Sequence, residues 1–142
     1  PYALGFHHKH LPEMRRVAGL DHAPHFEPIV GPFYRGMAVS VALVPGALRR
    51  RPGPEALRDL LAEHYAGARF VRVAPWEAEP ALDGGFLDPT AANASNRADV
   101  HVFGNDEFLQ VTVVLDNLGK GAGGAAAPGG ATPPRPRRSG AA

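Results

Sequence analysis

Cysteine is absent from all 142 residues of the chain. Its absence excludes disulfide bridges, thiolate metal ligands and a cysteine nucleophile within this sequence. Long hydrophobic runs are also absent, since none approaches the roughly 20 apolar residues that a membrane-spanning helix needs, and we expect no membrane partner. Residues 119–142 contain no apolar side chain larger than alanine. Such a segment cannot bury a core face, so we expect residues 127–142 to form a disordered Gly/Pro/Arg tail.

Basic charge is scarce outside that tail. The chain carries 15 Lys and Arg against 14 Asp and Glu, and four of the basic residues lie in residues 119–142, which hold no acid. The remaining 11 basic and 14 acidic residues give residues 1–118 a net charge of −3. Because nucleic-acid binding relies on a basic excess, we expect no nucleic-acid partner.

The hydrophobic share of 44% is sufficient for one folded domain. The residue patterns predict helices over 12–18 and 54–66, and strands over 37–44, 69–75, 100–104 and 108–116, with 24–30 extended and 75–85 a loop. The last two strands form a hairpin around Asn105-Asp106. Gly19 and Gly67 are typical helix ends, and one face of the second helix is predicted to be buried: Leu57, Leu60, Leu61, His64 and Tyr65. This order predicts an α+β domain with a mixed, largely antiparallel sheet and helices on one face.

Three histidines near the start of the chain are candidates for acid–base chemistry, because imidazole titrates near neutral pH. In an extended segment His8 and His10 would point to the same side, opposite to His7. A two-histidine metal site is conceivable, but no third ligand has a diagnostic spacing, and the residues alone favour surface histidines over a metal site.

Polar loops supply the other candidates. Arg35 lies in a glycine-bounded loop before a strand, where a guanidinium can clamp a carboxylate or phosphate or can simply be solvated. Four polar residues precede the strand at 100, a pattern that favours turn chemistry: Asn93, Ser95, Asn96 and Arg97. The glycine-rich stretch after Asp116 can approach an anion or form a plain turn, and its spacing matches no standard phosphate-binding motif.

The order of several motifs adds a resemblance. The motifs are H-K-H-L-P-E-M at 8–14, P-x-V-G-x-F-Y-R-G-M at 28–37, F-V-R-V at 70–73, L-D-P…N-A-S-N-R…V-H-V-F-G-N at 87–105 and D-N-L-G-K-G-A at 116–122. Together they resemble the N-acetyl-γ-glutamyl-phosphate reductases, in particular their short, type 2 form. The likeness covers residues 1–126, which would be the C-terminal catalytic and dimerisation domain, of the semialdehyde dehydrogenase and glyceraldehyde-3-phosphate dehydrogenase-like type.

The resemblance implies a function and a set of site residues. The family uses NADPH to reduce N-acetyl-γ-glutamyl phosphate to the semialdehyde in arginine biosynthesis, through a cysteine thioester. It implies proton transfer by His8, support from His10 and Glu13, substrate binding by Arg35, and cofactor contacts from Asn117, Lys120 and Gly121. The nucleophile and the NADP-binding half would lie N-terminal to this sequence, so we expect the chain alone to be inactive. A homo-oligomer in the cytoplasm is also implied.

Two departures keep alternatives open. After residue 126 the family continues as an apolar helix, which the prolines at 128, 133, 134 and 136 forbid here. The chain also begins at Pro1 without an initiator methionine, as a piece of a longer protein would. A non-catalytic dimerisation module is therefore a second hypothesis, and a small histidine metal-binding protein is a third. The sequence does not choose between His8 and His10 as the proton shuttle, or between N-acetylglutamyl and related acyl-phosphate substrates.

Overall fold

The computed structural model describes residues 1–5, 7–76 and 82–119, with the backbone alone described at 82–83. The chain divides into two compact units, Pro1–Phe33 and Tyr34–Ala142, each considered by itself below. The expected domain boundary at residue 126, the tail of 127–142, and Lys120 and Gly121 lie outside the described residues.

The first unit contains one helix, α1, over His10–Ala18. It starts two residues before the predicted helix, so that Pro12 lies in its first turn, where the missing N–H costs nothing. Gly19 ends the helix as predicted, in the left-handed conformation at φ 66°, and its N–H donates to the carbonyl of Arg15. The N–H of Tyr2 donates to the carbonyl of Pro28 at 2.9 Å, which ties the start of the chain to the extended segment of 24–30.

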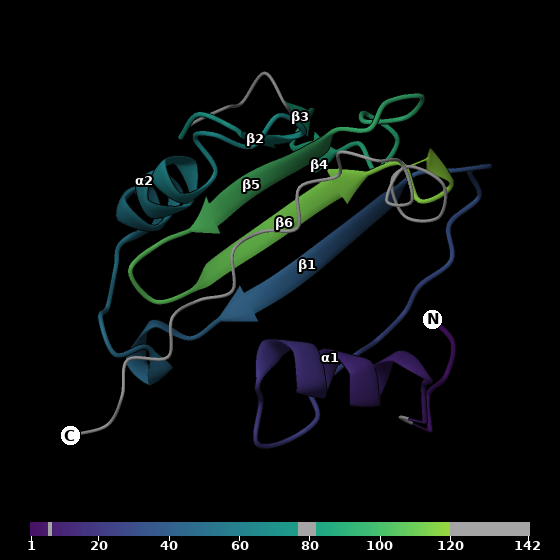
Figure 1. The fold of residues 1–142 in the computed structure, drawn as a ribbon, viewed down its shortest axis with the longest axis horizontal. Helices are drawn as coiled ribbons and strands as arrows, with labels where there is room; N and C mark the ends of the chain where they lie inside the picture. The colour runs from purple at the N-terminus through teal and green to yellow at the C-terminus, as the bar shows by residue number, and fades with distance from the viewer. Residues whose placement is uncertain (6, 77–81, 120–142) are drawn as a thin grey trace. The chain divides into compact units, whose positions relative to one another are not determined.

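The second unit is built on a four-stranded sheet with the order β1-β6-β5-β2 (Figure 1). Its strands are β1 (Met37–Leu43), β2 (Val71–Val73), β5 (Ala98–Gly104) and β6 (Leu109–Leu115). β6 pairs antiparallel with both β1 and β5, and β2 pairs parallel with β5. The mixed, largely antiparallel sheet is therefore confirmed, although β2 is four residues shorter than the predicted strand 69–75.

The predicted hairpin between β5 and β6 is present. Asn105 closes it: its N–H donates to the carbonyl of Phe108 at 2.8 Å, and its Oδ1 accepts the N–H groups of Glu107 and Phe108. Gly104 adopts φ 138°, and a Cβ there would overlap the carbonyl oxygen of Phe108. The turn therefore requires glycine at this position.

A second hairpin starts in the predicted loop of 75–85, ends just after it, and was missed. It joins β3 (Leu82–Asp83) to β4 (Phe86–Leu87) through Gly84 and Gly85, both at positive φ. Asp-Gly-Gly between apolar residues is a hairpin signal. The strands are only two residues each, too short for an alternating pattern to be visible in the sequence.

One face of the sheet packs against α2, over Pro54–His64 (Figure 1). Leu57, Val102 and Leu109 form the buried centre of this contact, with Leu61 and Trp76 packed against it. The predicted buried face of the helix is partly wrong, because Leu60 and His64 are exposed. The buried or half-buried side of the helix instead runs through 54, 57, 58, 61 and 62. The predicted cap at Gly67 is also wrong, since the C-cap is Tyr65, whose N–H bonds the carbonyl of Leu61.

The other face of the sheet carries a row of polar side chains, of which Thr112, His101 and Asp99 are buried. Register pairs Ser40 with Thr112 and Thr112 with His101, and Ser40 Oγ lies 2.9 Å from Thr112 Oγ1. Next to His101 on this face, the 3% exposed Asp99 is held by Arg72 and Arg97, with Nε–Oδ distances of 3.2 and 2.8 Å. Burial lowers the pKa of His101, opposed by the charge of Asp99 and reinforced by that of Arg72. The row thus holds its carboxylate in ion pairs while burial favours the neutral form of the imidazole.

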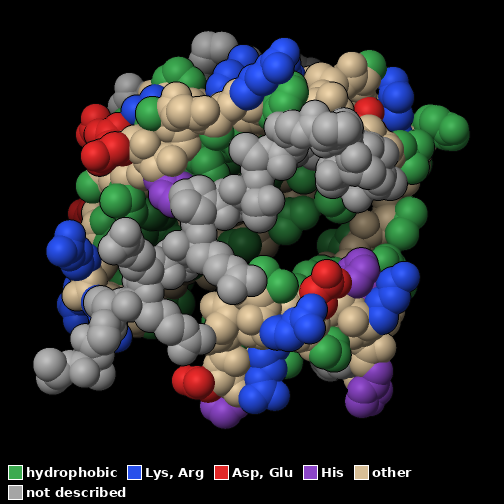
Figure 2. Space-filling model, in the orientation of Figure 1, with side chains coloured by type: hydrophobic (Ala, Val, Ile, Leu, Met, Phe, Trp, Pro, Cys, Tyr) green, Lys and Arg blue, Asp and Glu red, His purple; other side chains and the backbone are tan. Residues whose placement is uncertain are grey.

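The distribution of charged side chains on the surface (Figure 2) agrees with the lack of a basic excess in residues 1–118. On the face shown in Figure 2, the described basic side chains lie in small groups interspersed with acidic and apolar ones. Among the described helices, none has the length and the apolar character needed to cross a membrane.

The core contact of α2 gives a matched test. Leu57→Ala removes a side chain that is 8% exposed and should lower the free energy of unfolding by about 2–4 kcal/mol, because it leaves a cavity against Val102 and Leu109. Leu60→Ala, at a position 60% exposed on the same helix, should change it by less than about 0.5 kcal/mol. Urea unfolding of both variants measures the difference, and equal losses would contradict the assigned packing face.

Candidate functional site

The histidine segment of the first unit centres on His8. It is half-buried, whereas His7 and His10 are exposed. The backbone N–H of His10 donates to Nδ1 of His8 at 3.3 Å, and the two rings meet edge to face at 4.7 Å. Because Nδ1 accepts this hydrogen, the neutral ring carries its proton on Nε2, which is left as a hydrogen-bond donor.

The backbone here differs from the expected extended segment. Lys9 adopts a helical conformation as the N-cap of α1, and Leu11 N–H donates to the carbonyl of His8 at 3.1 Å. The turn, rather than strand alternation, therefore brings His8 and His10 together. Glu13 is exposed in the first turn of α1, where its charge suits the helix dipole, and no hydrogen bond or ion pair joins it to His8 or His10. Across the described residues, no three His, Cys, Asp or Glu side chains cluster closely enough to hold a metal ion.

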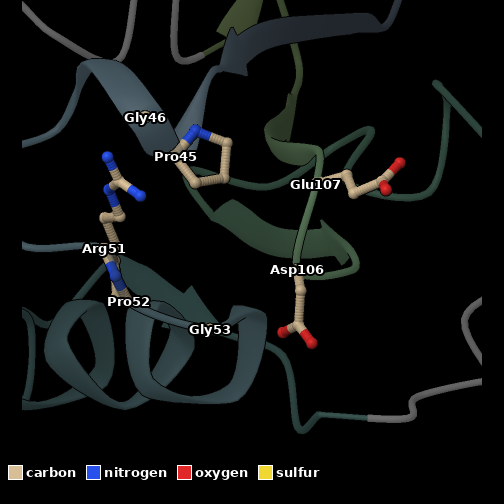
Figure 3. A pocket seen from close by; sticks show the side chains of 7 residues that line it. All are labelled: Pro45, Gly46, Arg51, Pro52, Gly53, Asp106 and Glu107. Atoms are coloured by element: carbon tan, nitrogen blue, oxygen red, sulfur yellow. The ribbon is translucent and has the colours of Figure 1, made fainter.

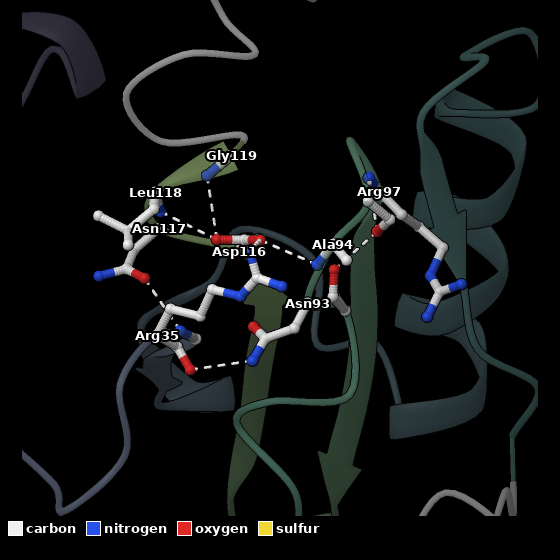
Figure 4. A network of polar contacts seen from close by, with 11 residues as sticks. Arg35, Asn93, Ala94, Arg97, Asp116, Asn117, Leu118 and Gly119 are labelled. Carbon is white, nitrogen blue, oxygen red and sulfur yellow. Dashed lines mark hydrogen bonds and ion pairs between the residues drawn. The ribbon is translucent and has the colours of Figure 1, made fainter.

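A second polar site lies in the other unit, around the carboxylate of Asp116 at the end of β6 (Figure 4). Asp116 is 1% exposed. Its Oδ1 accepts the N–H groups of Leu118 and Gly119, each at 3.0 Å, and its Oδ2 accepts the N–H of Ala94 at 2.9 Å. The carboxylate thus fixes the turn that follows β6 and attaches it to the loop before β5.

Arg35 reaches the same carboxylate from the loop before β1. Its Nη1 lies 3.6 Å from Oδ2 of Asp116, and its carbonyl accepts Nδ2 of Asn93 at 3.0 Å. Next to it, the N–H of Gly36 donates to Oδ1 of Asn117 at 2.9 Å. Gly36 has φ 118°, and a Cβ there would lie 2.6 Å from the carbonyl oxygen of Pro89. Only glycine fits, because both the backbone conformation and the available space exclude a side chain.

Hydrogen bonding sets the ionisation of this site. The backbone N–H of Gly119 lowers the pKa of Asp116, burial opposes it, and the N–H groups of Ala94 and Leu118 and the charge of Arg35 lower it further. The carboxylate therefore stays charged. The side chain of Arg35 is 39% exposed, and its guanidinium has more donors than the contact with Asp116 uses, so it can pair with an anionic ligand.

The residues expected from the sequence fall into two sets. His8, His10 and Glu13 belong to the first unit, and only the two histidines are in contact. Arg35 and Asn117 belong to the second unit and are joined through Gly36 and Asp116.

The residues that hold the second site were missed. Asp116 was assigned no role. Its side chain accepts the N–H groups two and three residues further on, which is an Asx-turn, and Asp is a residue that favours such turns. Ser95 confirms the expected turn chemistry by bonding the carbonyl of Ala92. Asn93 instead reaches a segment 58 residues away, which no local pattern indicates.

A groove of about 500 Å³ lies at the opposite end of the sheet, near the β5–β6 turn (Figure 3). Its charged lining residues are Arg51, Asp106 and Glu107. None of the residues expected from the sequence to form the site lines it, so the groove plays no part in the site described here.

Asp116→Asn should lower the urea midpoint, because an amide cannot accept hydrogen bonds through both of its terminal atoms. A lowered folded-state pKa contributes stability that is fully present above the ordinary value of 3.8 and is lost as the pH falls through the folded pKa. The gap between wild type and variant should thus be constant near neutral pH and close below 3.8. Asp106→Asn, at an exposed position, is the control and should show a small gap at every pH. A gap for Asp116→Asn that persists in acid would contradict the ionised form.

Comparison with known proteins places the chain in a family. Residues 1–117 match the model of the semialdehyde dehydrogenase dimerisation domain. An N-acetyl-gamma-glutamyl-phosphate reductase 2 from Nostoc sp. is 46% identical over 129 residues, covering 88% of this chain and 40% of the relative. Reductases of the same name from Burkholderia ambifaria and Chelativorans sp. are 45% and 44% identical, with coverage of 88% and 89% of this chain and 40% and 41% of the relatives. The chain spans about 40% of the length of these relatives, and it belongs to the semialdehyde dehydrogenase dimerisation-domain family.

Proposed function

We propose that this chain is the C-terminal part of an NADP-dependent N-acetyl-γ-glutamyl-phosphate reductase. The observation that carries the proposal is the identity of about 45% to reductases of that name across nearly nine-tenths of the chain. In this proposal residues 1–126 form the catalytic and dimerisation domain, and the nucleophile and the dinucleotide-binding domain lie outside this sequence.

His8 is proposed as the group that exchanges protons with the substrate. Its Nδ1 accepts the N–H of His10, so Nε2 carries the proton that the ring can give, and Nδ1 takes up the replacing proton when the bond from His10 opens. Half-burial supports His8 over the exposed His10 for this role, because a partly buried ring has fewer orientations. His10 then acts through its backbone N–H and its ring contact, and Glu13 acts as a charge on the first helical turn.

Arg35 is proposed as the substrate-binding residue. A guanidinium held on one side by a buried carboxylate and open on the other suits the carboxylate or phosphate of an acyl phosphate. Its carbonyl and its neighbour Gly36 are both bonded to asparagine side chains, so its backbone is fixed before a ligand arrives.

The described residues fit only part of an NADP site. Oδ1 of Asn117 already accepts the N–H of Gly36, which leaves its amide nitrogen as a donor to a cofactor. Lys120 and Gly121 are proposed to extend this contact. NADPH, when bound, supplies the hydride. The main binding surface is assigned to the domain outside this sequence.

A second copy of the chain is the proposed partner, and the cytoplasm the proposed location. The family model is that of a dimerisation domain, which supports a homo-oligomer. The same match favours the second candidate function, a dimerisation module without catalysis. Activity measurements on a longer protein that contains this domain separate the two.

The 142-residue chain by itself should show no reductase activity, because it has no cysteine to form the acyl intermediate. The test is an assay of the purified chain in the oxidative direction, with semialdehyde, NADP⁺ and phosphate. Turnover above the uncatalysed background would overturn the assignment of the nucleophile to another part of the protein.

In a longer protein carrying this domain, His8→Asn should lower kcat by roughly a hundred-fold or more, because the proton-transfer group is lost. KM should change much less, since binding is not the step affected. His7→Asn is the matched control, at an exposed neighbouring position, and should be mild. A crippled His7 variant beside a fully active His8 variant would show that the role belongs elsewhere.

A further inference from the structure

The imidazole of His8 contacts aromatic rings from three separate segments of the first unit. Phe26 lies edge to face with it, with ring centroids 5.0 Å apart and an interplanar angle of 62°. Tyr2 contacts it from the start of the chain at 5.9 Å and 64°, and His10 at 4.7 Å and 65°. Edge-to-face geometry of this kind is the favoured arrangement of aromatic pairs.

These contacts are held in place by the backbone. The bond from Tyr2 N–H to the carbonyl of Pro28 fixes the segment that carries Phe26 against the first residues of the chain. Phe26 is half-buried although its neighbours His25 and Glu27 are exposed. Phe26 thus lies on the half-buried side of this segment, with Pro24 and Pro28, and it is the aromatic side chain there that contacts His8.

We propose that Phe26 is the positioning residue of His8. The hydrogen bond from the His10 N–H is 3.3 Å long, which is weak, and it requires one orientation of the imidazole. The Phe26 ring restricts the rotation that would break this bond. It thereby keeps Nδ1 as the acceptor and holds the proton of the neutral ring on Nε2. The inference deepens the proposed function and rests on it for its catalytic meaning, whereas the ring contact and the hydrogen bond are features of this chain by itself.

Nitrogen-15 NMR of the histidine rings in the 142-residue chain tests the proposal, since ring nitrogen shifts distinguish the two neutral tautomers. At a pH where the ring is neutral, wild-type His8 should show the Nε2–H form. Phe26→Leu keeps the apolar volume but removes the ring, and should lower the ratio of the Nε2–H to the Nδ1–H form by about two- to ten-fold. Phe26→Tyr keeps the ring and should restore the wild-type ratio.

Phe86→Leu is the control, because Phe86 is 79% exposed in the other unit. It should leave the His8 signals unchanged. Unchanged methyl signals of Leu11, which is buried in the first unit, and of Val114, which is fully buried in the sheet, establish that both units of each variant are folded. A His8 tautomer ratio that is the same in Phe26→Leu as in wild type would overturn the proposal, and so would a Tyr variant that behaves like Leu.

Kinetics in a longer protein carrying this domain provide a separate readout. Phe26→Leu should lower kcat about five-fold or more with KM within about two-fold, and Phe26→Tyr should recover kcat. If that protein has no reductase activity at all, the proposed function fails, while the NMR result still decides whether Phe26 positions His8. A wild-type kcat in Phe26→Leu would refute the positioning role in catalysis.

Discussion

The second unit depends on one buried carboxylate. Asp116 bonds the backbone of the turn after β6 and of the loop before β5, and lies beside the guanidinium from the loop before β1. Three segments distant in the sequence are thereby fixed at one end of the sheet. A buried carboxylate is tolerable only when donors surround it, so the loops and the charge stabilise each other. The backbone conformations at Gly36 and Ala94, both at positive φ, persist because this network holds them.

The two faces of the sheet are packed in different ways. Its α2 face is an apolar contact, and its other face is a row of paired polar groups running from Ser40 to Arg72. β5 lies at the centre of both, and its residues from Ala98 to His101 are buried whichever way they point. A central strand of this kind leaves little freedom to the loops at its ends. That rigidity suits Arg35, because its carbonyl accepts a hydrogen bond from Asn93 in the loop before β5. The guanidinium therefore extends from a fixed backbone.

The histidine site of the first unit is built differently. Among the described residues no ion pair reaches the His8 ring, which instead accepts a weak hydrogen bond and contacts aromatic neighbours. Such contacts restrict the rotation of the ring without a charged partner beside it in the part of the chain that the structure describes. The two sites therefore place opposite requirements on the charge of their central group. Asp116 must remain charged under all ordinary conditions, and the proposed role of His8 requires that it change its charge.

The sequence by itself determined the α+β class, the two helices, the hairpin at Asn105 and the family, because these follow from local periodicity, turn chemistry and ordered motifs. It also indicated Arg35 and the neighbourhood of His8. Only the tertiary structure decided that Leu60 is exposed, that β2 is three residues long, and that Asn93 bonds a loop 58 residues away. The same holds for Asp116 and Phe26, whose partners come from other segments. Local patterns record which residues can form an element, whereas contacts between distant loops exist only once the chain has folded.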